Sequence, residues 1–286
     1  MAVANSHSPL FSLIMPAYNP GRQLGTTFAK LHAFLTTAGR DWEVLLVNDG
    51  STDGSPEDMD DFANSHPQVR ALHLPSNQGK GKAVRVGMLA ATSHFRIFTD
   101  IDMAYDCDQI LNVARQLESG KPIVIASRSH PQSELHAPAH LTAYMLKRRC
   151  QSYVFSRLVQ SLLDLPQRDT QAGLKGMSAQ AALDILPRLH CNGFAFDCEM
   201  LFACQQLGWP VHEIPVRVAW SSRASTIHWL SSLHMLKELW SIRRRRHEYQ
   251  RIQTQQRQPL QLRFAPPNPS QKTVTAALEP DRVRSR

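Results

Sequence analysis

The alternation of apolar and amphipathic segments along residues 1–130 constrains the fold more than any other feature of the sequence. Apolar, β-rich segments predict five strands, at Phe11–Met15, Trp42–Val47, Val69–Leu74, Phe95–Thr99 and Ile123–Ala126. The segments between them place apolar residues at helical spacing. Such alternation is typical of a mostly parallel sheet with helices on both faces. The sequence therefore predicts an α/β, Rossmann-like fold.

Local helix signals agree with this alternation. Ser55-Pro56 predicts an N-cap followed by proline at the first helical position. Lys80–Ala91 is expected to be helical, and Asp106 is expected to cap the helix after the fourth strand. Sheets of this kind bind ligands beyond the carboxyl ends of their strands. We therefore expect the functional site where polar motifs directly follow the strands.

The fourth strand ends in Thr99-Asp100-Ile101-Asp102. Alternate residues of an extended chain point the same way, so both carboxylates can converge on one hard cation. Mg²⁺ or Mn²⁺ bound there would neutralise charge on the diphosphate of a nucleotide. A solvated acidic loop or a helix cap explains the same pair, so the motif alone does not decide between them.

Two further polar segments follow the second and third strands. In Val47–Ser55, Asp49 is placed to accept hydrogen bonds from a nucleobase or ribose, although the glycines also suit an ordinary turn. In Asn77–Ala83, backbone N–H groups and two lysines at a helix start can form an anion site. The spacing does not fit a Walker loop, and no G-x-G-x-x-G follows the first strand, which argues against P-loop and dinucleotide enzymes.

The second half of the chain is predicted to be mainly helical. Residues 139–165 predict one or two helices, with basic residues among apolar ones, that can lie in a membrane interface. A short helix at Ala179–Leu186, a helix at Asp197–Leu207 and a strand at Val211–Ala219 follow. Residues 1–225 are expected to form the catalytic domain.

The positive charge of the chain is concentrated in its C-terminal part. Residues 1–225 hold 20 Lys and Arg against 20 Asp and Glu, whereas residues 226–286 hold 12 against 4, which accounts for the net charge of +8. Residues 226–247 predict a basic amphipathic helix, and the Gln- and Pro-rich residues 248–286 predict disorder. This arm suits an anionic phospholipid or nucleic-acid surface, and a solvated tail explains it as well.

Cysteine usage and hydropathy limit the class of protein. Five cysteines without a C-x-x-C pair argue against a disulfide framework or a zinc site, and fit reduced thiols. No segment approaches the roughly 20 apolar residues of a membrane span. Met1–Pro9 lacks the basic start and apolar block of a secretory signal. A cytoplasmic location, peripheral on the inner face of the membrane, is expected.

Seven motifs occur in one order along Ser12–Trp220: Pro16-Ala17-Tyr18-Asn19, Val47-Asn48-Asp49-Gly50-Ser51, Gly79-Lys80-Gly81-Lys82-Ala83, Asp100-Ile101-Asp102, Ser127-Arg128, Asp169-Thr170-Gln171 and Phe196-Asp197-Cys198-Glu199. Their order resembles family 2 glycosyltransferases with the GT-A fold, and within them the polyprenyl-phosphate sugar synthases. Asn48, in place of a frequent Asp, resembles the dolichyl-phosphate β-glucosyltransferase branch. Pro20 and Ala172 depart from the common Glu and Cys, which leaves the base and the sugar open.

The resemblance implies a role for each matching residue. The nucleoside would be bound by Pro16, Ala17, Tyr18 and Asp49, with Lys80 beside it. The diphosphate and its Mg²⁺ or Mn²⁺ would be held by Asp100 and Asp102. Arg128 would meet a phosphate between donor and acceptor, and the sugar side would be lined by Asp169, Gln171 and Asp197. The acceptor phosphate would be bound by Lys147, Arg148 and Arg149.

The resemblance implies inverting transfer of a hexosyl group from a nucleotide sugar to a polyprenyl phosphate at an anionic membrane surface. UDP-glucose is favoured as donor, with GDP-mannose and UDP-N-acetylglucosamine as alternatives. A phosphate with a second pKa near 6 is largely ionised at neutral pH, so its oxygen needs no strong general base.

Other functions stay open at this point. An enzyme acting on a saccharide or another non-lipid acceptor would need a carboxylate base, for which Asp197 is the candidate. A nucleic-acid binder led by the basic tail is disfavoured by the neutral body, so no nucleic-acid partner is expected. Solvated helix faces and helix caps also explain Arg148, Arg149, Asp197 and Glu199. Three aromatic residues, Phe194, Phe196 and Phe202, are expected in the core.

Overall fold

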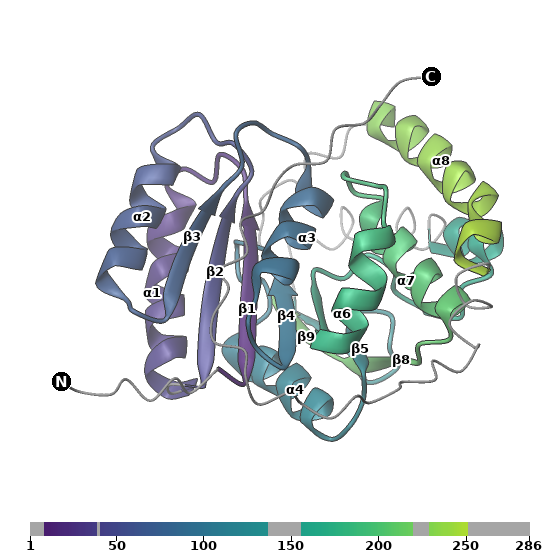
Figure 1. The fold of residues 1–286 in the computed structure, drawn as a ribbon. Coiled ribbons are helices and arrows are strands. Elements are labelled where there is room, and N and C mark those ends of the chain that lie inside the picture. Colours follow the sequence, from purple (N-terminus) through teal and green to yellow (C-terminus); the bar gives the residue numbers. More distant parts are fainter. Residues whose placement is uncertain (1–8, 39–40, 137–155, 220–228, 251–286) are drawn as a thin grey trace, which may run out of the picture.

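The computed structural model describes residues 9–38, 41–136, 156–219 and 229–250 (Figure 1). The strands are β1 (Phe11–Ala17), β2 (Trp42–Asn48), β3 (Val69–His73), β4 (Phe95–Thr99), β5 (Ile123–Ser127), β6 (Glu134–His136), β7 (Leu174–Ser178), β8 (Val211–Pro215) and β9 (Arg217–Ala219). The five strands predicted from the sequence are all present, with ends that differ from the expected ones by two residues at most.

The helices alternate with these strands in the first half of the chain and follow them in the second. They are α1 (Gln23–Ala38), α2 (Ser55–Ser65), α3 (Lys80–Ala90), α4 (Cys107–Glu118), α6 (Ala179–Ile185), α7 (Phe196–Leu207) and α8 (Trp229–Arg244), with a 3-10 helix η2 (Leu186–Arg188) after α6. Residues 156–163 are also helical. Asp106 caps α4 as expected, because its side chain accepts a hydrogen bond from the Gln109 amide.

Seven strands form one sheet in the order β3-β2-β1-β4-β7-β5-β8. Neighbouring strands are parallel except where β7 pairs antiparallel with β4 and with β5. The predicted α/β architecture with a mostly parallel sheet is thereby confirmed.

Helices cover both faces of this sheet (Figure 1). Side chains of a strand alternate between the faces, so neighbouring residues of β1 enter different cores. Ile14 lies in the core shared with α3, α6 and α7, whereas Leu13 lies in the core shared with α1, α2 and α4. Leu13 and Ile14 are both fully buried, and every residue of β1 and β2 is buried, which explains why both strands are almost continuously apolar.

β7 is the strand of the seven-stranded sheet that the sequence did not predict. Its segment Leu-Lys-Gly-Met-Ser contains a lysine and a glycine in place of an apolar run. Pairing with strands on both sides overrides this weak propensity. Because β7 runs against its neighbours, it starts at the edge where they end, and Leu174 pairs with Thr99.

Two expected element bounds were wrong. Gly54, and not Ser55, is the N-cap of α2, because Ser55 already begins the helix and its amide donates to Asp53. The expected strand Val211–Ala219 is broken at Val216, whose amide donates to Ser133 Oγ. β9 beyond the break pairs with β6 in a second, two-stranded sheet.

The C-terminal arm is ordered further than its composition indicates. Residues 246–250 are helical and Tyr249 is 2% exposed, so disorder does not begin at residue 248 as predicted. The reason is a buried partner, since the Tyr249 hydroxyl donates to Glu199. Residues 251–286 and residues 137–155, with Lys147, Arg148 and Arg149, lie outside the described residues. Of the helices described, none is long and apolar enough to cross a membrane.

Candidate active site

Asp49 joins three segments at the carboxyl edge of the sheet. Its amide donates to the Ala17 carbonyl at 2.8 Å, at the end of β1. Its buried carboxylate accepts the amides of Gln78 and Gly79, each at 2.8 Å. The predicted nucleoside residues Pro16 and Ala17 therefore lie beside the loop before α3. The carboxylate acts within the protein by holding this loop, and each oxygen keeps lone-pair capacity for a ligand.

The two aspartates after β4 differ in their surroundings. Lys80 Nζ lies 2.5 Å from Asp100 Oδ1. Burial lowers the pKa of Lys80, but the Asp100 and Asp197 carboxylates outweigh burial and raise it. Asp102 accepts the Ala104 amide at 3.1 Å and is exposed. Partial desolvation and then the charge of Asp100 raise the pKa of Asp102. Mutual repulsion of this kind favours a bound cation.

The donor set fits a divalent cation that is shared with a nucleotide. Asp100 and Asp102 offer hard oxygen ligands, which Mg²⁺ and Mn²⁺ prefer. Within the described ranges, no group of three or more His, Cys, Asp or Glu side chains could hold a metal ion. Mg²⁺ commonly binds through one or two carboxylates together with substrate phosphates. The arrangement therefore suits an ion whose remaining ligands come from a diphosphate.

The absence of a side chain at Gly173 leaves room for the Asp100 carboxylate. A Cβ atom at position 173 would lie 1.9 Å from Asp100 Oδ2, where no carbon atom fits. Residue 173 immediately precedes β7, and β7 pairs with β4 so that Leu174 is opposite Thr99. Only glycine allows the chain to pass behind the carboxylate in its present position. Its role depends on the pairing of β4 with β7, which the sequence did not predict.

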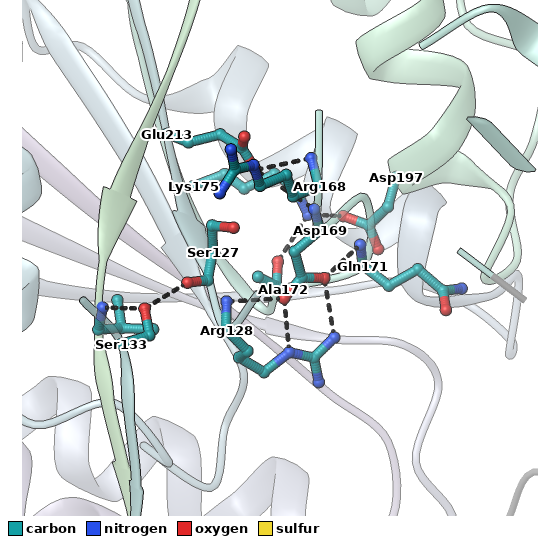
Figure 2. A network of polar contacts seen from close by, with 11 residues as sticks. Ser127, Arg128, Ser133, Arg168, Asp169, Gln171, Ala172, Lys175, Asp197 and Glu213 are labelled. Carbon is teal, nitrogen blue, oxygen red and sulfur yellow. Dashed lines mark hydrogen bonds and ion pairs between the residues drawn. The ribbon is translucent and has the colours of Figure 1, made fainter. Parts of the chain in front are cut away.

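Arg128 and Asp169 form a bidentate ion pair at the end of β5 (Figure 2). Arg128 Nε and one terminal nitrogen donate to the two carboxylate oxygens at 2.7 and 2.9 Å, and the Arg128 amide adds a contact at 2.9 Å. Burial raises the pKa of Asp169, but the bonds from Arg128 outweigh it and lower that pKa. The arginine side chain is 38% exposed, so part of the guanidinium stays available to a ligand.

Asp197 pairs with a lysine that the sequence did not single out. Lys175 Nζ lies 2.5 Å from Asp197 Oδ1, and the side chains are 0% and 5% exposed. Lys175 also donates to the Ala172 carbonyl at 2.6 Å, just after Gln171. The ammonium thus fixes the start of α7 against the segment before β7 (Figure 2). A lysine in a short segment without apolar alternation gave no sign of its burial, because the antiparallel strand was not expected.

The predicted site residues converge from both halves of the chain. The loop amides held by Asp49 continue into Lys80, Lys80 pairs with Asp100, and its pKa also responds to Asp197. The Gln171 amide donates to Asp169 at 3.2 Å, so Gln171 lies beside the Arg128–Asp169 ion pair. Tyr18, which directly follows β1, is 49% exposed. Their individual roles stay predictions.

Of the three phenylalanines expected in the core, two are there. Phe196 and Phe202 are each 1% exposed, but Phe194 is 51% exposed, so its assignment was wrong. Phe194 lies in the loop before α7 begins, and not on the helix face that packs against the sheet.

Comparison with known proteins agrees with this geometry. The model of the family described as Glycosyl transferase family 2 matches residues 12–185. The chain belongs to glycosyltransferase family 2. The matched residues include both aspartates of the Asp100–Asp102 motif and Lys175.

Several similar curated proteins are named dolichyl-phosphate beta-glucosyltransferase. A dolichyl-phosphate beta-glucosyltransferase of Drosophila melanogaster is 31% identical over 254 residues, which cover 84% of this chain and 76% of the relative. One of Trichomonas vaginalis is 29% identical over 215 residues, which cover 72% of this chain and 62% of the relative.

A solved structure supports the GT-A fold. It is glucosyl-3-phosphoglycerate synthase of Mycobacterium tuberculosis in complex with Mn²⁺, UDP-glucose and phosphoglyceric acid. The TM-score is 0.55 at 15% sequence identity, and the match covers 83% of this chain and 79% of that one. The predicted GT-A fold of this family 2 glycosyltransferase is therefore confirmed.

Replacement of Gly173 by Ala should displace Asp100 and leave the fold intact. The atom that clashes is the end of a side chain that can rotate away. We expect Mn²⁺-dependent transfer to fall by about 100-fold, as a displacement of about 1 Å can cause. Transferase assays and Mn²⁺ titration calorimetry measure the loss, with thermal melting as the check on folding.

Gly25→Ala is the matched control, since a Cβ there meets nothing within 4 Å. Full activity and Mn²⁺ affinity in Gly173→Ala would show that the position of Asp100 does not matter.

Proposed function

We propose that this glycosyltransferase moves a hexosyl group, with inversion, from a nucleotide sugar to a polyprenyl phosphate, with UDP-glucose as the favoured donor. The observation that supports this most is the pairing of the sugar-side carboxylates. Asp169 is bound by Arg128 and Asp197 by Lys175. A carboxylate bound to a cation is poorly placed to take a proton from a neutral hydroxyl. The site therefore suits an acceptor that arrives already ionised.

The comparisons support the proposal from another side. The curated relatives described above are named for dolichyl phosphate as acceptor and glucose as sugar. The solved structure contains UDP-glucose and Mn²⁺ on the same fold. Asn48, where related enzymes often have Asp, agrees with the glucosyltransferase branch, and its Oδ1 accepts the Ser51 amide at 2.8 Å.

Donor binding would divide between two groups of residues. The nucleoside would lie against Pro16, Ala17 and Tyr18, above the loop that Asp49 holds. Asp100 and Asp102 would hold a divalent ion on the diphosphate. When bound, that ion would neutralise the charge that develops on the leaving group. The Lys80 ammonium would add a fixed positive charge at the same place.

The transfer step follows from where the cations lie. An oxygen of the acceptor phosphate would attack the anomeric carbon from the face opposite the diphosphate. The new carbon–oxygen bond forms as the bond to the diphosphate breaks, and the electron pair leaves with the nucleoside diphosphate. The exposed part of the Arg128 guanidinium would hold the acceptor phosphate and offset its repulsion from the donor. Lys147, Arg148 and Arg149 would bind the same phosphate.

A soluble phosphorylated acceptor is the second candidate. The glucosyl-3-phosphoglycerate synthase structure contains phosphoglyceric acid beside UDP-glucose. Such an acceptor is also an anion and would use the same cations. It differs from a polyprenyl phosphate in having no lipid, so acceptor competition separates the two.

Wild-type protein given labelled UDP-glucose, Mn²⁺ and polyprenyl phosphate as sole acceptor should form a labelled lipid. Asp102→Ala should lower this transfer by at least about 100-fold, because it removes a ligand of the leaving group's counter-ion. Removal of the metal with EDTA should have the same effect. The exposed Asp61 on α2 gives the matched control, Asp61→Ala.

Thin-layer chromatography of the product gives the result. Retained metal-dependent transfer in Asp102→Ala would refute the metal role. Transfer to 3-phosphoglycerate but not to the lipid would favour the second candidate.

The outward face of α8 suggests where the protein meets the membrane. The four arginines Arg243–Arg246 do not all point the same way. Arg245 binds Glu199, and Arg246 binds Asp164 and Gln206. The exposed residues of the stretch 237–248 are Lys237, Trp240, Arg243, Arg244, His247 and Glu248. Of these, Arg243 also donates to the Leu162 carbonyl. The Arg244 guanidinium lies 4.6 Å from the centre of the Trp240 ring. We propose that this face rests on anionic phospholipid on the cytoplasmic side of a membrane.

Arg244→Glu should weaken binding to anionic vesicles by about tenfold or more, since each basic residue near such a surface contributes about 1 kcal/mol and a reversal counts twice. Flotation with phosphatidylglycerol-containing vesicles measures the effect. Arg115→Glu, an equal change of charge at an exposed position of α4, is the control. Equal flotation of both variants would contradict this orientation. Point variants are preferable to truncation at residue 243, which would also remove the inward Arg245 and Tyr249.

A further inference from the structure

Glu199 is a buried carboxylate with partners on three segments. It lies on α7, two residues after Asp197, and is 0% exposed. One oxygen accepts the amides of His190 and Cys191 at 2.8 and 2.6 Å. The other lies 3.1 Å from an Arg245 nitrogen and 3.2 Å from the Tyr249 hydroxyl. This carboxylate therefore joins the C-terminal arm to the loop that precedes α7.

The same loop supports the start of α3 from behind. The Asn192 carbonyl accepts the Lys82 amide at 3.2 Å, and Arg85 binds the Asn192 side chain at 2.7 Å. Gly79 has a φ of 98°, which favours glycine, and a Cβ there would lie 2.5 Å from the Asn192 carbonyl oxygen. The loop and residues 79–82 are thus in close contact, so a shift of one would displace the other.

Residues 79–82 reach the candidate active site directly. The Gly79 amide donates to Asp49 at 2.8 Å, and the adjacent Lys80 pairs with Asp100. A series of contacts therefore runs from Arg245 through Glu199, Cys191 and Asn192 to residues 79–82. α8 lies beside α7, at the end of this series of contacts (Figure 1).

We propose that Glu199 is a positioning residue, which uses Arg245 and Tyr249 of the C-terminal arm to fix the donor-binding segment Gly79–Lys82. This inference rests on the proposed function only in taking the donor to be a nucleotide sugar. It makes the C-terminal arm part of the donor site, in addition to any contact with a membrane.

Charge explains why the arm is needed. A buried carboxylate without a cation is strongly unfavourable, and removal of one partner of such a pair leaves the other uncompensated. Without Arg245, the buried Glu199 carboxylate would be drawn toward water, where its charge is solvated. That displacement would lengthen its bonds to the His190 and Cys191 amides. The loop behind Gly79 would then loosen.

The test compares Arg245→Met with Arg246→Met in the full chain. Both substitutions remove one positive charge from the same run, but only Arg245 contacts Glu199. Hydrogen exchange of the ligand-free proteins is measured at residues 78–83, at residues 190–192 and in the core strands β1 and β4. We expect faster exchange in the first two segments of Arg245→Met, with β1 and β4 unchanged and Arg246→Met like wild type.

Steady-state kinetics with UDP-glucose and Mn²⁺ supply the second measurement. We expect the KM for the donor to rise about tenfold in Arg245→Met, the usual effect of losing one charge-assisted contact, with a smaller change in kcat. Tyr249→Phe removes only a hydroxyl and should show the same pattern to a smaller extent. It keeps the test decisive if Arg245→Met does not fold.

Three results would overturn the proposal. Unchanged exchange at residues 78–83 would show that the loop does not transmit the change. Equal acceleration in β1 and β4 would show that Glu199 only stabilises the fold. An unchanged donor KM despite faster exchange would remove its role in donor binding. If the wild type neither binds UDP nor transfers glucose, the proposed function fails, and exchange at residues 78–83 alone decides the positioning role.

Discussion

The antiparallel pairing of β7 between β4 and β5 is the constraint on which the candidate site depends. Parallel strands all end at one edge, whereas a reversed strand begins there. The segment before β7 therefore meets the end of β4, which puts Gly173 behind Asp100 and Asp169 beside Arg128. Lys175, the second residue of β7, reaches Asp197 on α7. One reversed strand thus joins both halves of the chain around the site.

Ion pairs fix the charged side chains at this carboxyl edge of the sheet. Lys80 with Asp100, Arg128 with Asp169 and Lys175 with Asp197 each place a cation on a carboxylate. The buried charges among them, Asp169, Lys175 and Asp197, need partners, so their positions are fixed before a ligand binds. Asp102 differs, because it is exposed and repelled by Asp100, which suits a site completed by a cation and a diphosphate. The Glu199–Arg245 pair extends the same principle to the C-terminal arm.

The sequence predicted what depends on local pattern and order. Periodicity and apolar runs predicted the five parallel strands, strand ends predicted Asp49 and Asp100, and the family resemblance added Arg128. Lys175, Gly173 and Glu199 act through contacts between residues far apart in the chain, and no short pattern encodes such contacts. The sequence predicts a basic amphipathic helix at residues 226–247 but not that Arg245 turns inward to the buried Glu199 while Arg246 pairs with the exposed Asp164. Burial of Tyr249 likewise depends on Glu199, 50 residues earlier in the chain.

The central claim is that Asp100 and Asp102 hold a divalent ion on the diphosphate of a nucleotide sugar. Anomalous diffraction from crystals grown with UDP and Mn²⁺ tests it most directly. The account predicts a manganese peak about 2.1 Å from a carboxylate oxygen of Asp102 and from diphosphate oxygens, with the nucleoside beside Asp49. A nucleotide bound elsewhere, or bound at this edge with manganese away from both aspartates, would contradict it.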